Sequence, residues 1–162
     1  MVEALRDLEI VWLEEPFPPD DLAGYRALAA VSPIPLAAGE PELSVFGFRD
    51  LIASSSLAFA QPDIARCGGF TGAVQIASLC HAHHGPVCPH TGFSGGLNNL
   101  AIIHLAAGLL ENALLEWMII DNPLRDLFTE PLPSPKDGRL STVSGPGLGL
   151  DVDRLTDLGR RP

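Results

Sequence analysis

The chain has 162 residues, of which 46% are apolar and 19% charged, and its formal net charge at pH 7 is −10. This length fits one domain with a buried core, whereas a complete β/α barrel typically needs about 250 residues. The acidic balance, with Lys136 as the single lysine, argues against non-specific nucleic-acid binding, because phosphate backbones attract clustered lysine and arginine.

Short apolar runs alternate with amphipathic segments through the first half of the chain. The runs that predict strands are 9–13, 35–39 and 57–61. The segments that predict helices are 20–30, 44–52 and 71–83. Asp20 or Asp21 is a suitable cap for the first helix, and Ser44 for the second, because their side-chain oxygens accept hydrogen bonds from free backbone amides.

The second half continues this alternation and then changes character. Strands are predicted at 86–88 and 113–117, on either side of a small-residue loop at 91–96 and a helix at 97–110. From Asn122 onward the chain is rich in proline and glycine, with a short helix predicted at 153–158. Strands that alternate with helices indicate a parallel sheet with right-handed crossovers. We therefore predict an α/β fold with a partial β/α barrel at 1–121 and an irregular tail at 122–162.

Four of the predicted strands end in a side chain that can carry chemistry. They are Glu14, Glu40, Asp63 and His90, at spacings of 26, 23 and 27 residues. Each spacing is close to one strand plus one helix. A parallel β/α arrangement therefore places these side chains at the same end of adjacent strands, where β/α barrels keep their active sites.

Glu14 and Glu40 are candidate ligands of a metal ion. Their carboxylates should converge from neighbouring strands, and Mg²⁺ is a hard cation that prefers oxygen ligands. The alternative for Glu14 is a strand-end surface charge or a cap of the following helix. Glu40 taken alone is no more specific, because Gly-Glu is a common dipeptide.

Asp63 and His90 form the second candidate pair. A carboxylate that accepts the Nδ1 hydrogen of an imidazole fixes its tautomer, which makes the histidine a competent general acid or base. The alternative is a structural histidine bonded to a loop. Glu116, on the predicted fifth strand, could hydrogen-bond a substrate oxygen. Arg66 could steady a substrate carboxylate or form a salt bridge.

The order of these motifs resembles the enolase superfamily, specifically the mandelate racemase subgroup of the mandelate racemase / muconate lactonizing enzyme family. The motifs are Trp12-Leu13-Glu14-Glu15-Pro16, Ala38-Gly39-Glu40, Gln61-Pro62-Asp63 with Arg66-Cys67-Gly68-Gly69, Cys88-Pro89-His90, Leu115-Glu116-Trp117 and the closing Pro146-Gly147-Leu148-Gly149. Each motif alone is weak. Together, in this order and at this spacing, they cover nearly the whole chain.

The resemblance implies a role for each strand-end residue. Glu14 and Glu40 match the second and third ligands of an essential Mg²⁺. His90 matches the catalytic acid/base, Asp63 its orienting partner, and Glu116 the group that hydrogen-bonds the substrate carboxylate or the developing enediolate. The shared chemistry is abstraction of a proton alpha to a carboxylate, which Mg²⁺ assists by stabilising the charge that develops on the oxygens.

The resemblance also implies that this chain corresponds to strands four to eight of the barrel. The capping domain and the first three strands, which bear an aspartate ligand and usually a Lys-x-Lys pair, have no counterpart among these residues. Two protein ligands and an absent cap would leave the site open to water, so we expect the isolated chain to be inactive. An open five-stranded remnant would also expose two strand edges, so we expect it to associate, for example as a homo-oligomer.

An acid-sugar dehydratase is the function that these residues favour. A racemase or epimerase of a 2-hydroxy acid is the alternative, and a truncated chain without catalysis is a third hypothesis. The three cysteines show no CxxC spacing, so neither a disulfide framework nor a zinc cluster is indicated. The charges at Glu3, Arg6 and Asp7 interrupt any signal-peptide pattern, and no apolar run reaches the roughly 18 residues of a membrane helix. We expect a cytoplasmic protein that binds a small-molecule acid and neither nucleic acid nor membrane.

Overall fold

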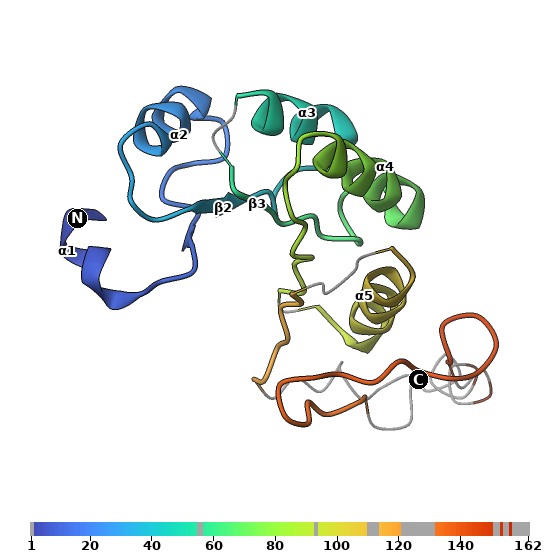
Figure 1. The fold of residues 1–162 in the computed structure, drawn as a ribbon. Coiled ribbons are helices and arrows are strands. Elements are labelled where there is room, and N and C mark those ends of the chain that lie inside the picture. The colour runs from blue at the N-terminus through green and yellow to red at the C-terminus, as the bar shows by residue number, and fades with distance from the viewer. Residues whose placement is uncertain are drawn as a thin grey trace, which may run out of the picture. The chain divides into compact units, whose positions relative to one another are not determined.

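The computed structural model divides the chain into two compact units (Figure 1). The first contains Met1–His90 and Ala113–Leu115, and the second Thr91–Asn112 and Glu116–Pro162. The structure describes residues 2–54, 57–92, 94–109, 114–120 and 132–150, together with Asp153 and Thr156. Each unit is described by itself.

The first unit is built on a parallel sheet. Its strands are β1 (Leu13–Glu14), β2 (Leu36–Ala38) and β3 (Phe59–Ala60), in the order β1-β2-β3. Leu13 is aligned with Leu36, and Ala38 with Ala60. Two isolated parallel bridges, Ala60 with Val87 and Asp63 with His90, extend the same pattern to the predicted fourth strand. The α/β fold with a parallel sheet is therefore confirmed.

The first predicted strand begins later than the sequence suggested. Residues Val2–Leu5 form α1, and Arg6–Leu8 form a 3-10 turn, η1. Glu9 follows η1 with a φ of +50°, in the left-handed region that ends helices. The apolar run at 9–13 thus contributes only Leu13 to a strand.

Three helices connect the strands of this unit, as predicted. They are α2 (Leu22–Ala29), α3 (Val45–Ala53) and α4 (Gly69–Ala82). Asp21 caps α2 by accepting the amide of Gly24 over 2.8 Å, and Ser44 caps α3 by accepting the amide of Gly47 over 3.4 Å. Both predicted caps are confirmed. Helices α3 and α4 lie side by side (Figure 1).

The two faces of the sheet pack differently. Tyr25 of α2 forms a buried cluster with Leu36 and Ala38 of β2, so these alternate strand residues face the helices. On the other face, the rings of Trp12 and Phe59 meet with centroids 4.9 Å apart. Glu14 alternates with Leu13, which packs against the Tyr25 cluster, so Glu14 lies on this second face, which in a β/α barrel is the interior.

The second unit contains α5 (Gly96–Leu109) and the described part of the tail. Leu100, Ile102 and Ile103 are all buried, as expected for a helix that is apolar all round. No helix or strand forms within 132–150, where Lys136 and Arg139 make an isolated antiparallel bridge. Asp153 and Thr156 are helical, and the rest of the helix predicted at 153–158 lies outside the described residues.

The fifth predicted strand is absent from the described residues Leu114–Trp117. The hydroxyl of Thr91 donates to the carbonyl oxygen of Glu116 over 3.2 Å, so a side chain occupies an acceptor that a strand would offer to a backbone amide. Among the helices that the structure describes, none is both long and apolar enough to cross a membrane.

Candidate active site

The backbone after β3 brings Asp63 and His90 into register. Cys88 donates its amide to the carbonyl oxygen of Ala60 over 2.9 Å, and His90 donates its amide to that of Pro62 over 3.1 Å. These bonds run the 87–90 segment parallel to the end of β3. Asp63 and His90 thus become bridge partners, as their positions after successive predicted strands suggested.

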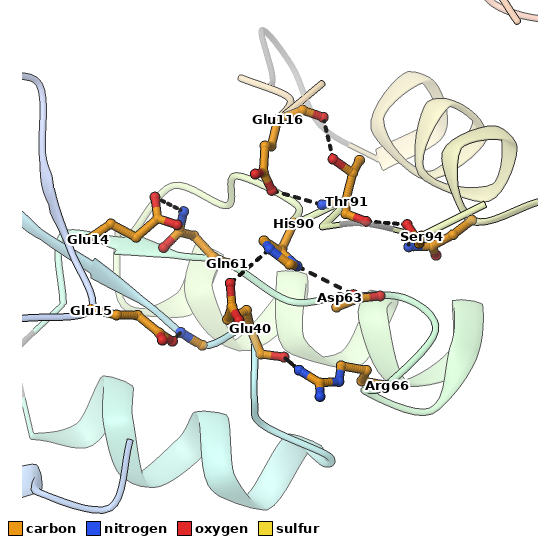
Figure 2. A network of polar contacts seen from close by, with 12 residues as sticks. Glu14, Glu15, Glu40, Gln61, Asp63, Arg66, His90, Thr91, Ser94 and Glu116 are labelled. Carbon is orange, nitrogen blue, oxygen red and sulfur yellow. Dashed lines mark hydrogen bonds and ion pairs between the residues drawn. The ribbon is translucent and has the colours of Figure 1, made fainter. Parts of the chain in front are cut away.

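The imidazole of His90 lies between two carboxylates (Figure 2). Its Nδ1 is 3.4 Å from Oδ2 of Asp63, and its Nε2 is 2.8 Å from Oε2 of Glu40. The other oxygen of Asp63 accepts the amide of Ala65 over 2.8 Å, which fixes the carboxylate. Because Asp63 and His90 are 6% and 8% exposed, the pair is nearly removed from water.

Glu40 reaches His90 because Gly39 allows a close approach at the end of β2. Gly39 has a φ of +130°, and a Cβ at this position would lie 2.5 Å from Cε1 of the buried Phe48. Arg66 donates from Nη1 to the backbone oxygen of Glu40 over 3.2 Å (Figure 2). Arg66 therefore contacts the backbone of a candidate metal ligand.

Glu14 is held by two neutral donors. Its Oε2 accepts a hydrogen bond from Nε1 of Trp12 over 3.0 Å and one from Nε2 of Gln61 over 2.8 Å. Sequence reasoning missed the role of Gln61. The signal was available, because Gln61 precedes Asp63 by two residues and alternate residues in an extended segment share a face.

Glu15 is a second residue that sequence reasoning did not single out. Its φ of +38° lies in the left-handed region, which is uncommon for residues other than glycine. Its Oε1 accepts the amide of Gly39 over 3.5 Å. Burial raises the pKa of Glu15; the hydrogen bond from Gly39 lowers it, the charges of Glu40 and Glu14 raise it, and His90 lowers it. Like charges are therefore crowded at this end of the sheet.

A Mg²⁺ ion fits the chemistry of these carboxylates. In the part of the chain that the structure describes, no three His, Cys, Asp or Glu side chains lie close enough together to hold a metal ion. Glu14 and Glu40 nevertheless offer hard oxygen donors from adjacent strands, beside the crowded charge at Glu15. Proteins commonly bind Mg²⁺ through one or two carboxylates, with water completing the octahedron. The donor set fits on that basis.

Glu116 belongs to the second unit, where Thr91 holds it at two points (Figure 2). The amide of Thr91 donates to Oε2 of Glu116 over 2.9 Å, in addition to the bond from the Thr91 hydroxyl to the Glu116 carbonyl. Thr91 in turn accepts a hydrogen bond from Ser94, whose hydroxyl accepts one from Asn98 of α5 over 2.8 Å. The Glu116 carboxylate is thereby tied to the start of α5.

Known proteins share both this fold and this sequence pattern. The chain is 31% identical to D-galactonate dehydratase of Xanthomonas oryzae pv. oryzae, over 92% of this chain and 41% of that protein. It is 30% identical to D-galactarolactone cycloisomerase of Agrobacterium fabrum, over 90% of this chain and 40% of that protein. The chain therefore spans about 40% of the length of these relatives.

A solved structure is also similar to this chain. The 3,6-anhydro-D-galactonate cycloisomerase of Zobellia galactanivorans superposes with a TM-score of 0.86 at 31% identity, over 96% of this chain and 44% of that one. The family model described as "Enolase C-terminal domain-like" matches residues 1–156. The chain therefore belongs to the enolase C-terminal domain-like family, as the carboxyl-terminal portion of a mandelate racemase / muconate lactonizing enzyme barrel.

Proposed function

We propose that this chain is the part of a Mg²⁺-dependent acid-sugar dehydratase that carries the proton-transfer pair and two of the metal ligands. The observation that supports this most strongly is the position of His90 between Asp63 on Nδ1 and Glu40 on Nε2. One carboxylate fixes the tautomer of the imidazole. The other belongs to a candidate metal ligand, so the reactive nitrogen faces the place where a metal-bound substrate would lie.

In this proposal His90 moves the protons. With Nδ1 directed at Asp63, Nε2 takes the proton alpha to the substrate carboxylate and gives a proton to the β-hydroxyl group. That group leaves as water and an enol remains. The enol becomes a 2-keto-3-deoxy acid when its 2-hydroxyl loses a proton and carbon 3 gains one. Burial of the pair limits its contact with bulk water.

The remaining residues orient the substrate. Glu14 and Glu40 would hold Mg²⁺, which when bound supplies positive charge against the negative charge that develops on the substrate carboxylate. Glu116, held by Thr91, would hydrogen-bond a substrate oxygen. Arg66 contacts the backbone of Glu40, so we assign it support of that strand end rather than direct substrate binding.

Incubation with a panel of aldonates and aldarates tests the proposal. The full-length protein should convert at least one acid sugar to a 2-keto-3-deoxy acid when Mg²⁺ is present. It should convert none after Mg²⁺ has been removed by a chelator. Solvent deuterium exchange at the alpha carbon without loss of water would instead support racemisation or epimerisation.

A cycloisomerase is the second candidate, because the names of two similar proteins describe that reaction. Both reactions begin with the same proton abstraction, so the strand-end residues do not distinguish them. Adding sugar-acid lactones and anhydro sugar acids to the panel separates the two. A cycloisomerase yields a product of unchanged mass, whereas a dehydratase yields a product lighter by one water.

A further inference from the structure

Strands β1 and β3 are not neighbours in the sheet, yet their flanking side chains meet across β2. Trp12 contacts Phe59, and Gln61 donates to Glu14. Between them lies Ala37, whose backbone is aligned with both Glu14 and Phe59. Because Ala37 has only a methyl group, longer side chains on either side can reach over the middle strand.

The two hydrogen bonds to Glu14 end on the same oxygen. Nε1 of Trp12 and Nε2 of Gln61 both donate to Oε2, over 3.0 Å and 2.8 Å (Figure 2 shows the second). Among the residues that the structure describes, none donates to Oε1. One oxygen is therefore held in place, which leaves the other aimed in a fixed direction.

Both donors are themselves restrained. Gln61 is 3% exposed, and its backbone amide donates to the carbonyl oxygen of Ala38 over 3.0 Å. Trp12 is fixed by its ring contact with Phe59. Such partners restrict the rotamers of a flexible glutamate side chain and so orient its carboxylate. Part of the rotamer entropy is then already lost before a ligand binds.

The donors are also uncharged, and this matters at a metal site. A lysine or arginine in the same place would pair with the carboxylate and compete with a cation for its charge. An indole N–H and an amide N–H orient the carboxylate while leaving its full negative charge available. Donors that hold a ligating group in this way typically strengthen metal binding.

We propose that Gln61 and Trp12 are positioning residues that hold Oε2 of Glu14 so that Oε1 faces the cation. This inference rests on the proposed function, since it assigns the two residues to the Mg²⁺ site of that reaction. It predicts that the loss of either donor weakens the hold on Mg²⁺ more than it affects the chemical step.

Two substitutions remove one donor each: Gln61→Met, which nearly keeps the shape of the side chain, and Trp12→Phe, which keeps an aromatic ring beside Phe59. In the full-length protein we expect Gln61→Met to weaken Mg²⁺ affinity by 10- to 100-fold by calorimetry, the range typical of such partners. The Mg²⁺ concentration for half-maximal activity should rise in parallel, while kcat at saturating Mg²⁺ changes less than threefold. If the two residues had a merely structural role, the substitutions would lower the urea midpoint of unfolding without separating the effect on Mg²⁺ affinity from the effect on kcat. Gln75→Met, at an exposed position on α4, is the matched control and should change neither quantity.

A second readout needs no metal. In the same protein labelled with ¹⁵N, Glu14→Ala should shift the resonances of the Gln61 side-chain amide and the Trp12 indole, and leave that of the Gln75 amide in place. If neither resonance moves, the hydrogen bonds are not formed in solution and the inference is overturned.

The outcomes separate this inference from the proposed function. If the unaltered protein binds Mg²⁺ and dehydrates an acid sugar while Gln61→Met binds Mg²⁺ equally well, only the positioning role is overturned. If the unaltered protein neither binds Mg²⁺ nor converts any acid sugar, both are overturned.

Discussion

The hydroxyl of Tyr25 donates a hydrogen bond to the carbonyl oxygen of Phe17 over 3.0 Å, and their rings meet edge-on with centroids 5.8 Å apart. Phe17 lies in the loop that follows β1, and Tyr25 is fully buried on α2. This contact ties the loop after Glu14 and Glu15 to the first helix. It therefore supports the strand end from the side of the sheet opposite the candidate site.

Replacement of Tyr25 by phenylalanine should destabilise the fold modestly. Tyr25→Phe keeps the ring contact but removes the hydroxyl that donates to the Phe17 carbonyl, so we expect a loss of about 1 kcal/mol in the free energy of unfolding. Urea unfolding at pH 7 measures this. A loss above about 3 kcal/mol would show that the ring itself had moved, and that the phenylalanine no longer fits the cluster.

Tyr25 should also make stability depend on alkaline pH. Burial, followed by the charge of Glu15, raises the pKa of Tyr25 from 10.0 to about 12. The folded chain therefore keeps this proton at pH values where the unfolded chain releases it. The contribution is fully present below pH 10 and is lost as pH rises towards 12. Urea midpoints across this range should fall more steeply for the unaltered chain than for Tyr25→Phe.

Gly39 should tolerate no side chain. Gly39→Ala places a methyl group against the Phe48 ring at a backbone φ of +130°. The energetic cost of overpacking is therefore added to the cost of a strained backbone. We expect a loss of about 2 to 4 kcal/mol by urea unfolding. Gly69→Ala is the control, because Gly69 has a φ of +67° with open space around its Cβ. Equal losses in the two variants would contradict the role assigned to Phe48.

Asp63 should control the tautomer of His90. In Asp63→Asn the amide no longer attracts the Nδ1 hydrogen, so we expect ¹⁵N spectra to show a change in the protonated ring nitrogen of His90. If the proposed function holds, kcat of the full-length protein should fall by a factor of about 10² to 10⁴ with little change in Mg²⁺ affinity. An unchanged tautomer would mean that another contact orients the ring.

Cys67 and Cys80 should react slowly with alkylating agents in the folded chain. Burial raises the pKa of each thiol from 9.0 to about 11, so little thiolate exists at pH 8, and both side chains are shielded. Mass spectrometry after brief treatment with iodoacetamide should find both thiols unmodified, and both alkylated once urea is added. Rapid labelling without urea would indicate that the first unit opens readily.

Sequence reasoning predicted the features that depend on local chemistry. Asp21 and Ser44 cap helices because short polar side chains capture free amides wherever a helix begins. The spacing of Asp63 and His90 predicted that they lie side by side, because parallel strands align equivalent ends. The same logic placed Glu14 and Glu40 on adjacent strands, but the structure does not test their roles.

Features that depend on long-range fit were not predicted from the sequence. The hydrogen bond from Gln61 to Glu14 crosses a strand, so it requires the small side chain at position 37. The fifth predicted strand also depended on contacts that the sequence does not reveal: over the described residues 114–117 no strand forms, and the side chain of Thr91 occupies the carbonyl oxygen of Glu116.

The side chain of Ala37 is a methyl group that makes no hydrogen bond, yet the contact between Gln61 and Glu14 passes over it. A bulky residue there, as in Ala37→Leu, would separate Gln61 from Glu14 and Phe59 from Trp12 at once. Among enzymes built on the same sheet, a glutamine at position 61 should therefore occur together with a small residue at position 37. Such covariation would be evidence, independent of this structure, that the side chain at position 61 reaches over position 37.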